Sequence, residues 1–364
     1  MNGLTRRTLL FLFLITVVLS AAEWDWQLPK GVPRPVVPAD NPMTAAKVEL
    51  GRHLFYDRRM SVNGKGGCAG CHIQSLAFTE GHARPESVVG DIHPRSSMSI
   101  VNVAYAPSLT WANSGPTTLE EQALGALLSL EPIIELGLLD HEEEFLDMVR
   151  KDSTYQRLFP QAFPGESQIT LKNVSKALAA FERSIVSMRS PYDRYKWEGD
   201  ASAISAAAKR GEQIFSSNER GGCAQCHGGW NFEAVRVEGG QSESQENGIF
   251  FNTGVEAYEA PNRGLYESTG RFDDFGRFRA PSLRNIALTD PYMHDGSIPS
   301  LEAVIEHYEA GGMFGQANKT RILRPLTLSD GDKSDLIEFL KTLTDQELLH
   351  DPRWSDPWPA NYGN

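Results

Sequence analysis

Two short motifs carry the residues best suited to chemistry in this 364-residue chain. Each has two cysteines separated by two residues and a histidine directly after the second: Cys68, Cys71 and His72, then Cys223, Cys226 and His227. Two thiols with this spacing can form thioethers to both vinyl groups of a haem, and the histidine that follows can bind the iron. The motifs therefore predict two covalently bound haems of c type.

There are two alternatives to haem. Each cysteine pair could be a redox dithiol, or the four cysteines, which are the only ones in the chain, could together bind one zinc ion. The histidine after each motif favours haem over both alternatives. A basic and apolar leader points the same way, since it predicts export. So does the helix expected immediately before each motif.

A helical repeat precedes the two motifs. Apolar spacing predicts helices over residues 43–56 and 205–215, and the segment Gly51–Phe55 matches Gly211–Phe215. A repeated helix–loop–haem unit implies two cytochrome-c-like domains in a mostly α fold. We expect a signal peptide at 1–22, an extended arm at 23–42, an N-terminal domain at 43–198 and a C-terminal domain at 199–364.

Two further helices and one loop follow from the pattern. Apolar residues in steps of three and four predict a helix over 169–188. Another is expected over 329–343, with Ser329 as N-cap and Asp332 three residues later. Residues 239–247 are polar and acidic, which is typical of a loop, and no convincing run of alternating strands occurs.

Charge and leader limit the partners and the compartment. The formal net charge of −12 argues against nucleic-acid binding and favours a partner with a basic docking face. Arg6 and Arg7, the apolar run 9–19 and the small residues 20–22 form a secretory signal pattern; an uncleaved anchor is the alternative. The apolar run is too short for a comfortable membrane span, so we expect a mature periplasmic protein with no membrane span.

Several segments around the motifs point to a family. In order they are Arg95–Tyr105, Trp111, Leu119–Gly125, Pro132–Gly137, Ser190–Tyr195, Asn252–Gly254, Arg279–Ala287 and Thr289–Gly296. With the two haem motifs they resemble the bacterial di-haem cytochrome c peroxidase and MauG superfamily. The opening segments Trp24–Trp26 and Asp40–Met43 are further similar to its MbnH-type members, which are associated with methanobactin genes.

The resemblance implies that the N-terminal haem reacts with hydrogen peroxide, with Gln122 and Glu135 on its distal side. Peroxide cleavage needs a group that moves a proton between oxygens, and a carboxylate in a partly apolar pocket can have a pKa suited to it. A solvated turn carboxylate is the alternative for Glu135. Trp111 matches the tryptophan that lies between the haems in this family; an ordinary core aromatic is the alternative. His82 and His93 could cap the first haem or be surface histidines.

At the second haem the resemblance assigns the distal ligand to Tyr308. Peroxidases of the family have methionine at this position, whereas MauG-type enzymes have tyrosine. A phenolate stabilises oxidised iron, whereas a thioether favours reduced iron. The other candidates nearby are Met293, His294, His307 and Met313.

The resemblance also implies a calcium ion between the haems, bound partly by main-chain carbonyl oxygens. Thr289 and Pro291 match two of its ligand positions. Ser96 stands where the family has an asparagine ligand, and a hydroxyl is a weaker oxygen donor for a hard cation.

The expected function is that of a di-haem oxidoreductase that uses hydrogen peroxide to oxidise a partner protein, with tryptophan side chains as targets and high-valent iron on both haems. The first alternative is a cytochrome c peroxidase that takes electrons from a small cytochrome c or cupredoxin. The second is a non-enzymatic electron carrier. Distal ligation separates these functions, because a carrier needs two six-coordinate irons and a peroxidase leaves one open.

Overall fold

Helices make up most of the regular structure, as expected. The computed structural model describes residues 24–128, 134–233, 249–255, 261–312, 318–360 and 362. The helices are α1 (Ala45–Tyr56), α2 (Leu119–Leu128), α3 (Glu142–Lys151), α4 (Ser153–Ala162), α5 (Leu171–Ser184), α6 (Pro191–Trp197), α7 (Ala206–Ser216), α8 (Tyr266–Thr269), α9 (Leu301–Glu309) and α10 (Asp330–Lys341). In these ranges the one sheet is an antiparallel pair, β1 (Phe250–Phe251) and β2 (Phe278–Arg279), with Phe250 opposite Arg279.

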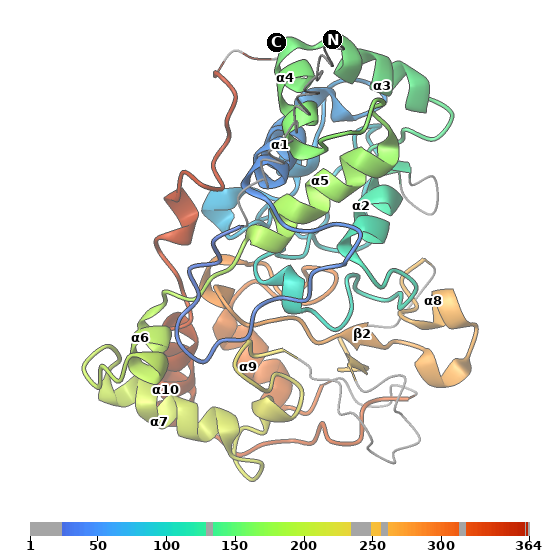
Figure 1. Ribbon diagram of the computed structural model, residues 1–364. Helices are drawn as coiled ribbons and strands as arrows, with labels where there is room; N and C mark the ends of the chain where they lie inside the picture. Colours follow the sequence, from blue (N-terminus) through green and yellow to red (C-terminus); the bar gives the residue numbers. More distant parts are fainter. Residues whose placement is uncertain are drawn as a thin grey trace, which may run out of the picture.

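The fold has two halves, each built around a pair of packed helices. Helices α1 to α5 form one half, and α6, α7, α9 and α10 lie in the other (Figure 1). Helix α1 packs against α5, and α7 packs against α10. The larger hydrophobic cluster draws on residues 43–185 and on Leu348, Leu349 and Trp354 of the C-terminal tail. A second cluster draws on residues 192–343. Each helix pair thus has its own core, in keeping with two cytochrome-c-like units.

The repeated glycines lie where the helices of each pair touch. A Cβ atom on Gly51 would come 1.9 Å from the carbonyl oxygen of Ala177 in α5. A Cβ atom on Gly211 would come 2.0 Å from the carbonyl oxygen of Asp335 in α10. Both distances are far below van der Waals contact, so only glycine allows the backbones to approach this closely. The sequence repeat therefore marks the same helix contact in both halves.

The four predicted helices are present with ends close to those expected, and the largest difference is at the end of α5. Ser205 accepts from Ala208 N–H at the start of α7, and Ser329 and Asp332 form a reciprocal capping box at the start of α10. Helix α5 ends at Ser184, whereas the apolar pattern extends to Met188. Asn102 ends the helix early. Its backbone N–H donates to the carbonyl oxygen of Ile185 and its side-chain oxygen accepts from the N–H of Ser187, so these groups bond outside the helix.

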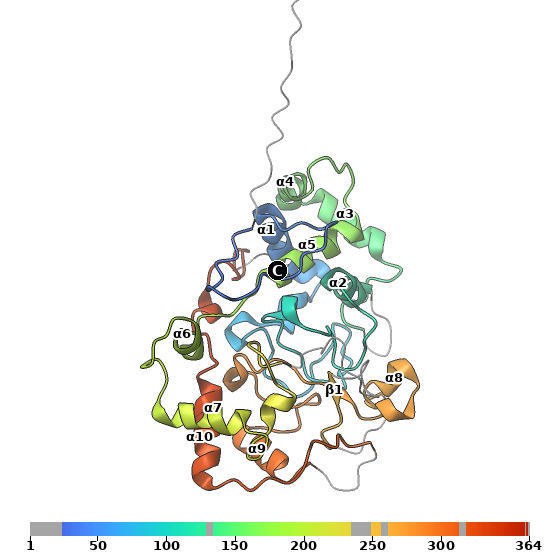
Figure 2. The same cartoon turned by 60° about the horizontal axis from the view of Figure 1, so that its bottom comes forward.

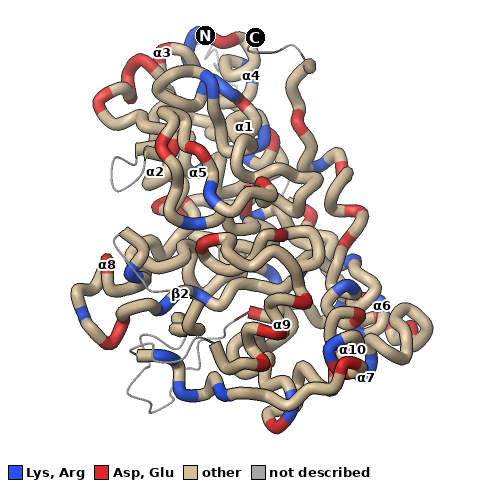
Figure 3. The backbone as a smooth tube through the Cα atoms, turned by 180° about the vertical axis from the view of Figure 1, so that it is seen from behind, with Lys and Arg blue, Asp and Glu red and all other residues tan. Residues whose placement is uncertain are grey.

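The arm that begins at residue 24 and the C-terminal tail both contact the body of the molecule. Residues 24–43 contain no helix or strand, and Tyr105 donates to the carbonyl of Pro33 in this arm. The C-terminal tail leaves α10 and returns to the N-terminal half, where Leu348 and Trp354 join the larger cluster (Figures 1 and 2). Acidic residues gather at the start of α3 (Figure 3).

The predicted leader and the polar loop 239–247 lie outside the described residues. Within the described residues, no helix is both long enough and apolar enough to cross a bilayer.

Candidate haem-binding sites

The first motif follows α1 and begins a short 3-10 turn, Cys68–Gly70. The backbone then reverses at Ala77 and Phe78, which have positive φ angles of 52° and 59°. This reversal brings the carbonyl oxygen of Phe78 to 3.0 Å from Nδ1 of His72. With Nδ1–H donated to a carbonyl, Nε2 is the ring nitrogen left for a metal. The motif therefore has the arrangement that a proximal histidine needs.

The second motif has the same arrangement in the other half of the molecule. It follows α7 with the 3-10 turn Cys223–Gln225, and Nδ1 of His227 lies 2.9 Å from the carbonyl oxygen of Pro281. The carbonyl comes from a distant segment here and from a local turn in the first motif. Both histidines are thus held in the same tautomer by a main-chain acceptor.

A large cavity opens beside the second motif and tests whether a haem fits. It contains about 1480 Å³ of empty space, including the part open to solvent, and its lining is mostly apolar. Cys223, Cys226 and His227 line it, and Leu336 and Leu340 of α10 form part of its wall. A porphyrin needs such a space, with two thiols and an imidazole on one side. The residues present therefore fit a covalent haem.

The four cysteines are half-buried. None is in a disulfide. Burial raises the pKa of the Cys71 thiol to about 12, that of Cys223 to about 11 and that of Cys226 to about 12. None of the four is a thiolate at neutral pH, so none is poised for disulfide exchange.

Tyr308 lies on the wall of the same cavity as His227. It is half-buried on α9, which begins after the N-cap Ser300. His307, its neighbour, places Nε2 3.0 Å from the carbonyl oxygen of Thr253 instead. This contact weakens His307 as an alternative ligand.

The remaining candidate ligands have different positions. Met293 and His294 also line the second cavity. His82 is exposed and His93 is half-buried, both in the loop that follows the first motif. Met313 lies outside the described residues.

Glu135 lies on the loop that folds back along α2. The N–H of Leu136 donates to the carbonyl of Ala126 at 3.3 Å, and Gln122 lies one helical turn before Ala126 on the same face. The backbone next to Glu135 thus contacts α2 four residues after Gln122, and a shared site for the two side chains stays a prediction. Residues 129–133 between them lie outside the description.

The surroundings of Glu135 connect it to the first motif. Glu135 is exposed to solvent, as the alternative of a solvated turn carboxylate expects, but partial desolvation by the surrounding protein atoms still raises the pKa of its carboxyl. Burial is the main cause of the raised pKa values of Cys68 and Cys71, and the charge of Glu135 raises both further. The carboxyl is therefore within electrostatic range of both thiols.

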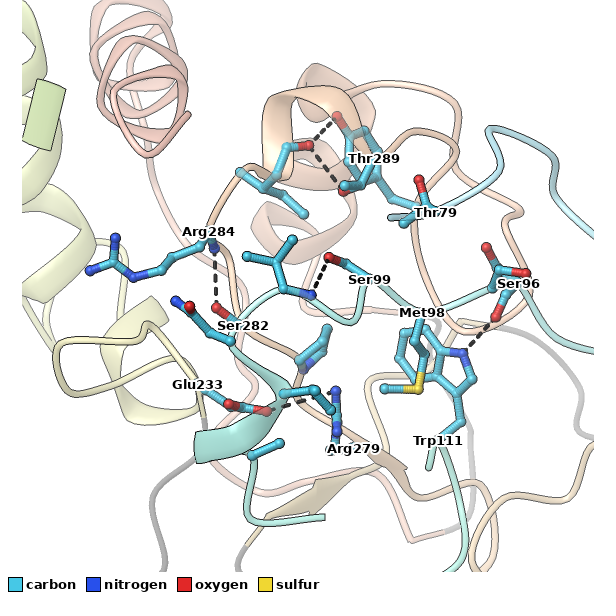
Figure 4. A pocket seen from close by; sticks show the side chains of 18 of the residues that line it. Thr79, Ser96, Met98, Ser99, Trp111, Glu233, Arg279, Ser282, Arg284 and Thr289 are labelled. Carbon is cyan, nitrogen blue, oxygen red and sulfur yellow. Dashed lines mark hydrogen bonds and ion pairs between the residues drawn. The ribbon is translucent and has the colours of Figure 1, made fainter. Parts of the chain in front are cut away.

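A second cavity is lined by residues next to both motifs (Figure 4): Thr79 follows Phe78, and Pro281 accepts the hydrogen bond from His227. Its lining includes Trp111, Ser96, Thr289 and Pro291, so the predicted bridging tryptophan and the three predicted calcium positions come together. The indole Nε1–H of Trp111 donates to the carbonyl oxygen of Ser96 at 2.8 Å. Trp111 also lines the cavity beside the second motif. It therefore borders both spaces.

The calcium ion stays a prediction. Among the described residues, no group of three His, Cys, Asp or Glu side chains could hold a metal ion. A calcium site here would have to use carbonyl and hydroxyl oxygens, as the resemblance implies.

Two buried ion pairs near this cavity have no predicted role. Arg279 faces Glu233 at 3.7 Å, as Figure 4 shows, and Arg284 pairs with Asp193 at 2.9 Å. Burial raises the pKa of Glu233, and Arg279 and Asn231 oppose this shift. Both arginines belong to the segment Arg279–Ala287, which the sequence analysis singled out without assigning them a role. The sequence signal for the buried pair was Glu233 itself, a charged residue that directly follows Phe232 close to a haem motif.

Comparisons with known proteins agree with this arrangement. The profile of the di-haem cytochrome c peroxidase family matches residues 45–202. The chain is 35% identical to cytochrome-c peroxidase IdrP1 of Denitromonas iodatirespirans, over 93% of this chain and 92% of that protein. It is 32% identical to the methylamine utilization protein MauG of Methylorubrum extorquens, over 89% and 85% of the two chains.

A solved structure extends the likeness to three dimensions. The crystal structure of a MauG-like protein associated with microbial copper homeostasis superposes with a TM-score of 0.86 at 41% identity. The match covers 92% of this chain and 100% of that one. The chain therefore belongs to the di-haem cytochrome c peroxidase and MauG family, a family of peroxidase-type oxidoreductases.

Proposed function

We propose that this peroxidase-type enzyme uses hydrogen peroxide to oxidise tryptophan side chains of a partner protein. The observation that carries the proposal is the position of Tyr308 on the wall of the cavity that also contains His227. A tyrosine there supports MauG-like chemistry, because a phenolate stabilises oxidised iron, whereas the methionine of the peroxidases favours reduced iron.

The first site supplies the peroxide chemistry in this proposal. Haem iron, when bound, draws two oxidising equivalents from each peroxide. Glu135 takes the proton from one peroxide oxygen and returns it to the oxygen that leaves as water, and Gln122 orients the peroxide beside it. The raised pKa of Glu135 supports this role, because a proton shuttle works best when its pKa approaches the working pH.

The path between the two sites runs through Trp111 in this proposal. Its side chain borders both the cavity next to the two motifs and the cavity of His227, and its N–H is held by the carbonyl of Ser96. A fixed indole between two distant sites can pass electrons in two short steps instead of one long one. Partner oxidation can then take place at a distance from the peroxide.

The proposed partner is a periplasmic protein that docks on the outside of this acidic molecule. The net charge of −12 supports a basic docking face on the partner. The MauG-like relative is associated with microbial copper homeostasis, which supports a partner that takes part in copper handling. The periplasmic assignment rests on the leader pattern of residues 1–22.

The test is to give the fully oxidised holoenzyme hydrogen peroxide together with candidate periplasmic partners, and to locate oxygen addition on the partner by peptide mass spectrometry. We expect mass gains on tryptophan-containing peptides of one partner, with none when peroxide or enzyme is left out. Fast turnover with reduced cytochrome c only after partial reduction, and no partner oxidation, would favour the cytochrome c peroxidase. Two low-spin haems without peroxide reactivity would favour the electron carrier.

A further inference from the structure

Three aromatic side chains form a connected row on the N-terminal half. The ring centroids of Tyr155 in α4 and Trp358 in the C-terminal tail lie 6.0 Å apart in an edge-on arrangement. Trp358 stacks on Tyr362 with centroids 3.7 Å apart and an interplanar angle of 9°. Tyr155 is fully buried, whereas Tyr362 is half-buried near the chain end. The row therefore leads from the core toward the surface.

The inner end of the row adjoins the first haem motif. The hydroxyl of Tyr155 donates to the carboxylate of Asp57 at 2.8 Å. A Cβ atom on Gly67 would lie 2.5 Å from the carbonyl oxygen of Asp57, so the backbone directly before Cys68 touches that residue. Cys68, Tyr155 and Trp358 all belong to or pack against the same hydrophobic cluster. Asp57 thus connects Tyr155 to the backbone just before Cys68, one of the two residues that attach the first haem.

Each tyrosine of the row has a proton acceptor in place. Tyr155 donates to Oδ2 of Asp57, and Tyr362 donates to Oδ2 of Asp152 at 2.7 Å. Arg59 bridges the two acids, at 2.7 Å from Asp57 and 3.1 Å from Asp152. A phenol that loses an electron becomes strongly acidic, so a carboxylate already within hydrogen-bond distance allows the electron and the proton to leave together.

The indole between the two phenols is also fixed. Nε1–H of Trp358 donates to the carbonyl oxygen of His53 at 2.9 Å, and the ring of His53 packs edge-on against it at 4.9 Å. The tail that carries Trp358 and Tyr362 lies beside α4, at the end of the molecule opposite α7, α9 and α10 (Figure 1). The row therefore leads away from the second motif.

We propose that Tyr155, Trp358 and Tyr362 form a relay that removes oxidising equivalents from the first haem site when no partner is docked. Tyr155 loses one electron to the peroxide-oxidised site, and its proton passes to Asp57. Trp358 then reduces Tyr155, which takes its proton back, and Tyr362 reduces Trp358 while its own proton passes to Asp152. The net result is one oxidised Tyr362 per equivalent, which a small hydrogen-atom donor in solution restores.

This relay rests on the peroxidase-type activity of the family and is independent of the substrate proposed above. It would operate equally in an enzyme that oxidises a protein and in one that oxidises a small cytochrome. A failure of the partner assay therefore leaves the relay untouched, and a failure of the relay leaves the partner assay untouched.

The experiment treats the holoenzyme with hydrogen peroxide in the absence of any partner, with the nitroso spin trap 2-methyl-2-nitrosopropane present. Peptide mass spectrometry then locates the adduct, and the fall in haem absorbance measures self-damage. We expect the adduct on Tyr362 in the natural protein. Tyr155→Phe should lower adduct formation on Tyr362 severalfold, and Tyr362→Phe should accelerate haem bleaching.

Tyr195→Phe is the matched control, because Tyr195 is also a half-buried tyrosine but lies on α6 in the other half. It should change neither the adduct nor the bleaching rate. An equal adduct on Tyr362 in Tyr155→Phe, or an unchanged bleaching rate in Tyr362→Phe, would overturn the relay. If Tyr155→Phe does not retain its haems, Tyr362→Phe and Trp358→Phe decide the question, since both change the tail alone.

Discussion

The ring Nδ1 of His227 donates a 2.9 Å hydrogen bond to the carbonyl oxygen of Pro281. His72 makes the corresponding bond to Phe78, at 3.0 Å. The two motifs thus present the same side of the imidazole to their haem positions. Differences between the two sites must then come from the opposite side of each haem, where we place Glu135 at the first and Tyr308 at the second.

Glu135→Gln should slow the reaction with hydrogen peroxide by about 10²-fold or more, the usual range for loss of a general acid–base group. Haem content should not change. Because desolvation raises the pKa of Glu135 above its ordinary 4.5, its basic form is lost at a higher pH than for a glutamate with the ordinary pKa. The natural enzyme should therefore lose rate as the pH falls through that raised pKa. Stopped-flow kinetics across pH measures both effects.

The control for this prediction is Glu144→Gln, because Glu144 is a largely exposed glutamate on α3. Its rate and pH profile should match those of the natural enzyme. An unchanged rate in Glu135→Gln would remove this carboxyl from the mechanism.

Gly51→Ala and Gly211→Ala should each lower the free energy of unfolding, by about 1–3 kcal/mol or more, the usual cost of overpacking. The added methyl group would meet the carbonyl oxygens of Ala177 and Asp335. Gly125→Ala is the matched control, since Gly125 lies in α2 with open space around it. That change should raise stability by about 0.4–1 kcal/mol. Urea unfolding of the holoproteins measures the free energy of unfolding of all three variants. The same change in Gly125→Ala as in Gly51→Ala and Gly211→Ala would contradict the close helix contacts.

Stability should fall as the pH rises from about 4.5 to about 8, in part because of Glu182. Burial raises the pKa of this carboxyl to about 8, from an ordinary value of 4.5. Between these values the folded protein keeps a proton that the unfolded chain has lost, so the stabilisation present below pH 4.5 disappears as the pH rises through 8. Glu182→Gln should flatten this part of the profile. Thermal unfolding at pH 5 and pH 8 checks it, and parallel profiles would contradict a neutral Glu182.

Trp111→Phe should slow electron exchange between the two haem sites without lowering haem content. Phenylalanine keeps an aromatic ring on the wall of both cavities but is much harder to oxidise, and it loses the bond to Ser96. The measurement is the rate of redox equilibration after rapid one-electron reduction of the holoenzyme. A rate equal to that of the natural protein would exclude Trp111 from the path.

The four helices that the sequence predicted are all present, together with the N-cap Ser329, because they depend on local patterns. The Ser329–Asp332 capping box, the N-cap Ser205 and the repeated glycines Gly51 and Gly211 are all visible in the order of residues. Contacts with distant segments are not visible there. Helix α5 ends early because Asn102, more than eighty residues away, forms hydrogen bonds with the carbonyl of Ile185 and the N–H of Ser187.

The candidate site shows the same division. The family motifs indicated Trp111, Ser96, Thr289 and Pro291, which line one cavity in the structure. The pairing of Arg279 with Glu233 is not apparent from the sequence, because it depends on how β2 meets the loop that follows the second motif. The row formed with Trp358 and Tyr362 was also beyond sequence reasoning, since nothing local indicates that the tail returns to α4.

The measurement that tests the account most directly is the electron paramagnetic resonance spectrum of oxidised Tyr308→Phe holoenzyme, before and after hydrogen peroxide. His307→Gln is the matched control, because His307 is the neighbouring residue on α9 and contacts Thr253 instead. If Tyr308 is the distal ligand of the second haem, the low-spin signal is lost in Tyr308→Phe and kept in His307→Gln. The yield of oxidised partner protein should then also be lower with Tyr308→Phe than with the natural enzyme. An unchanged low-spin signal and unchanged partner oxidation in Tyr308→Phe would contradict the account.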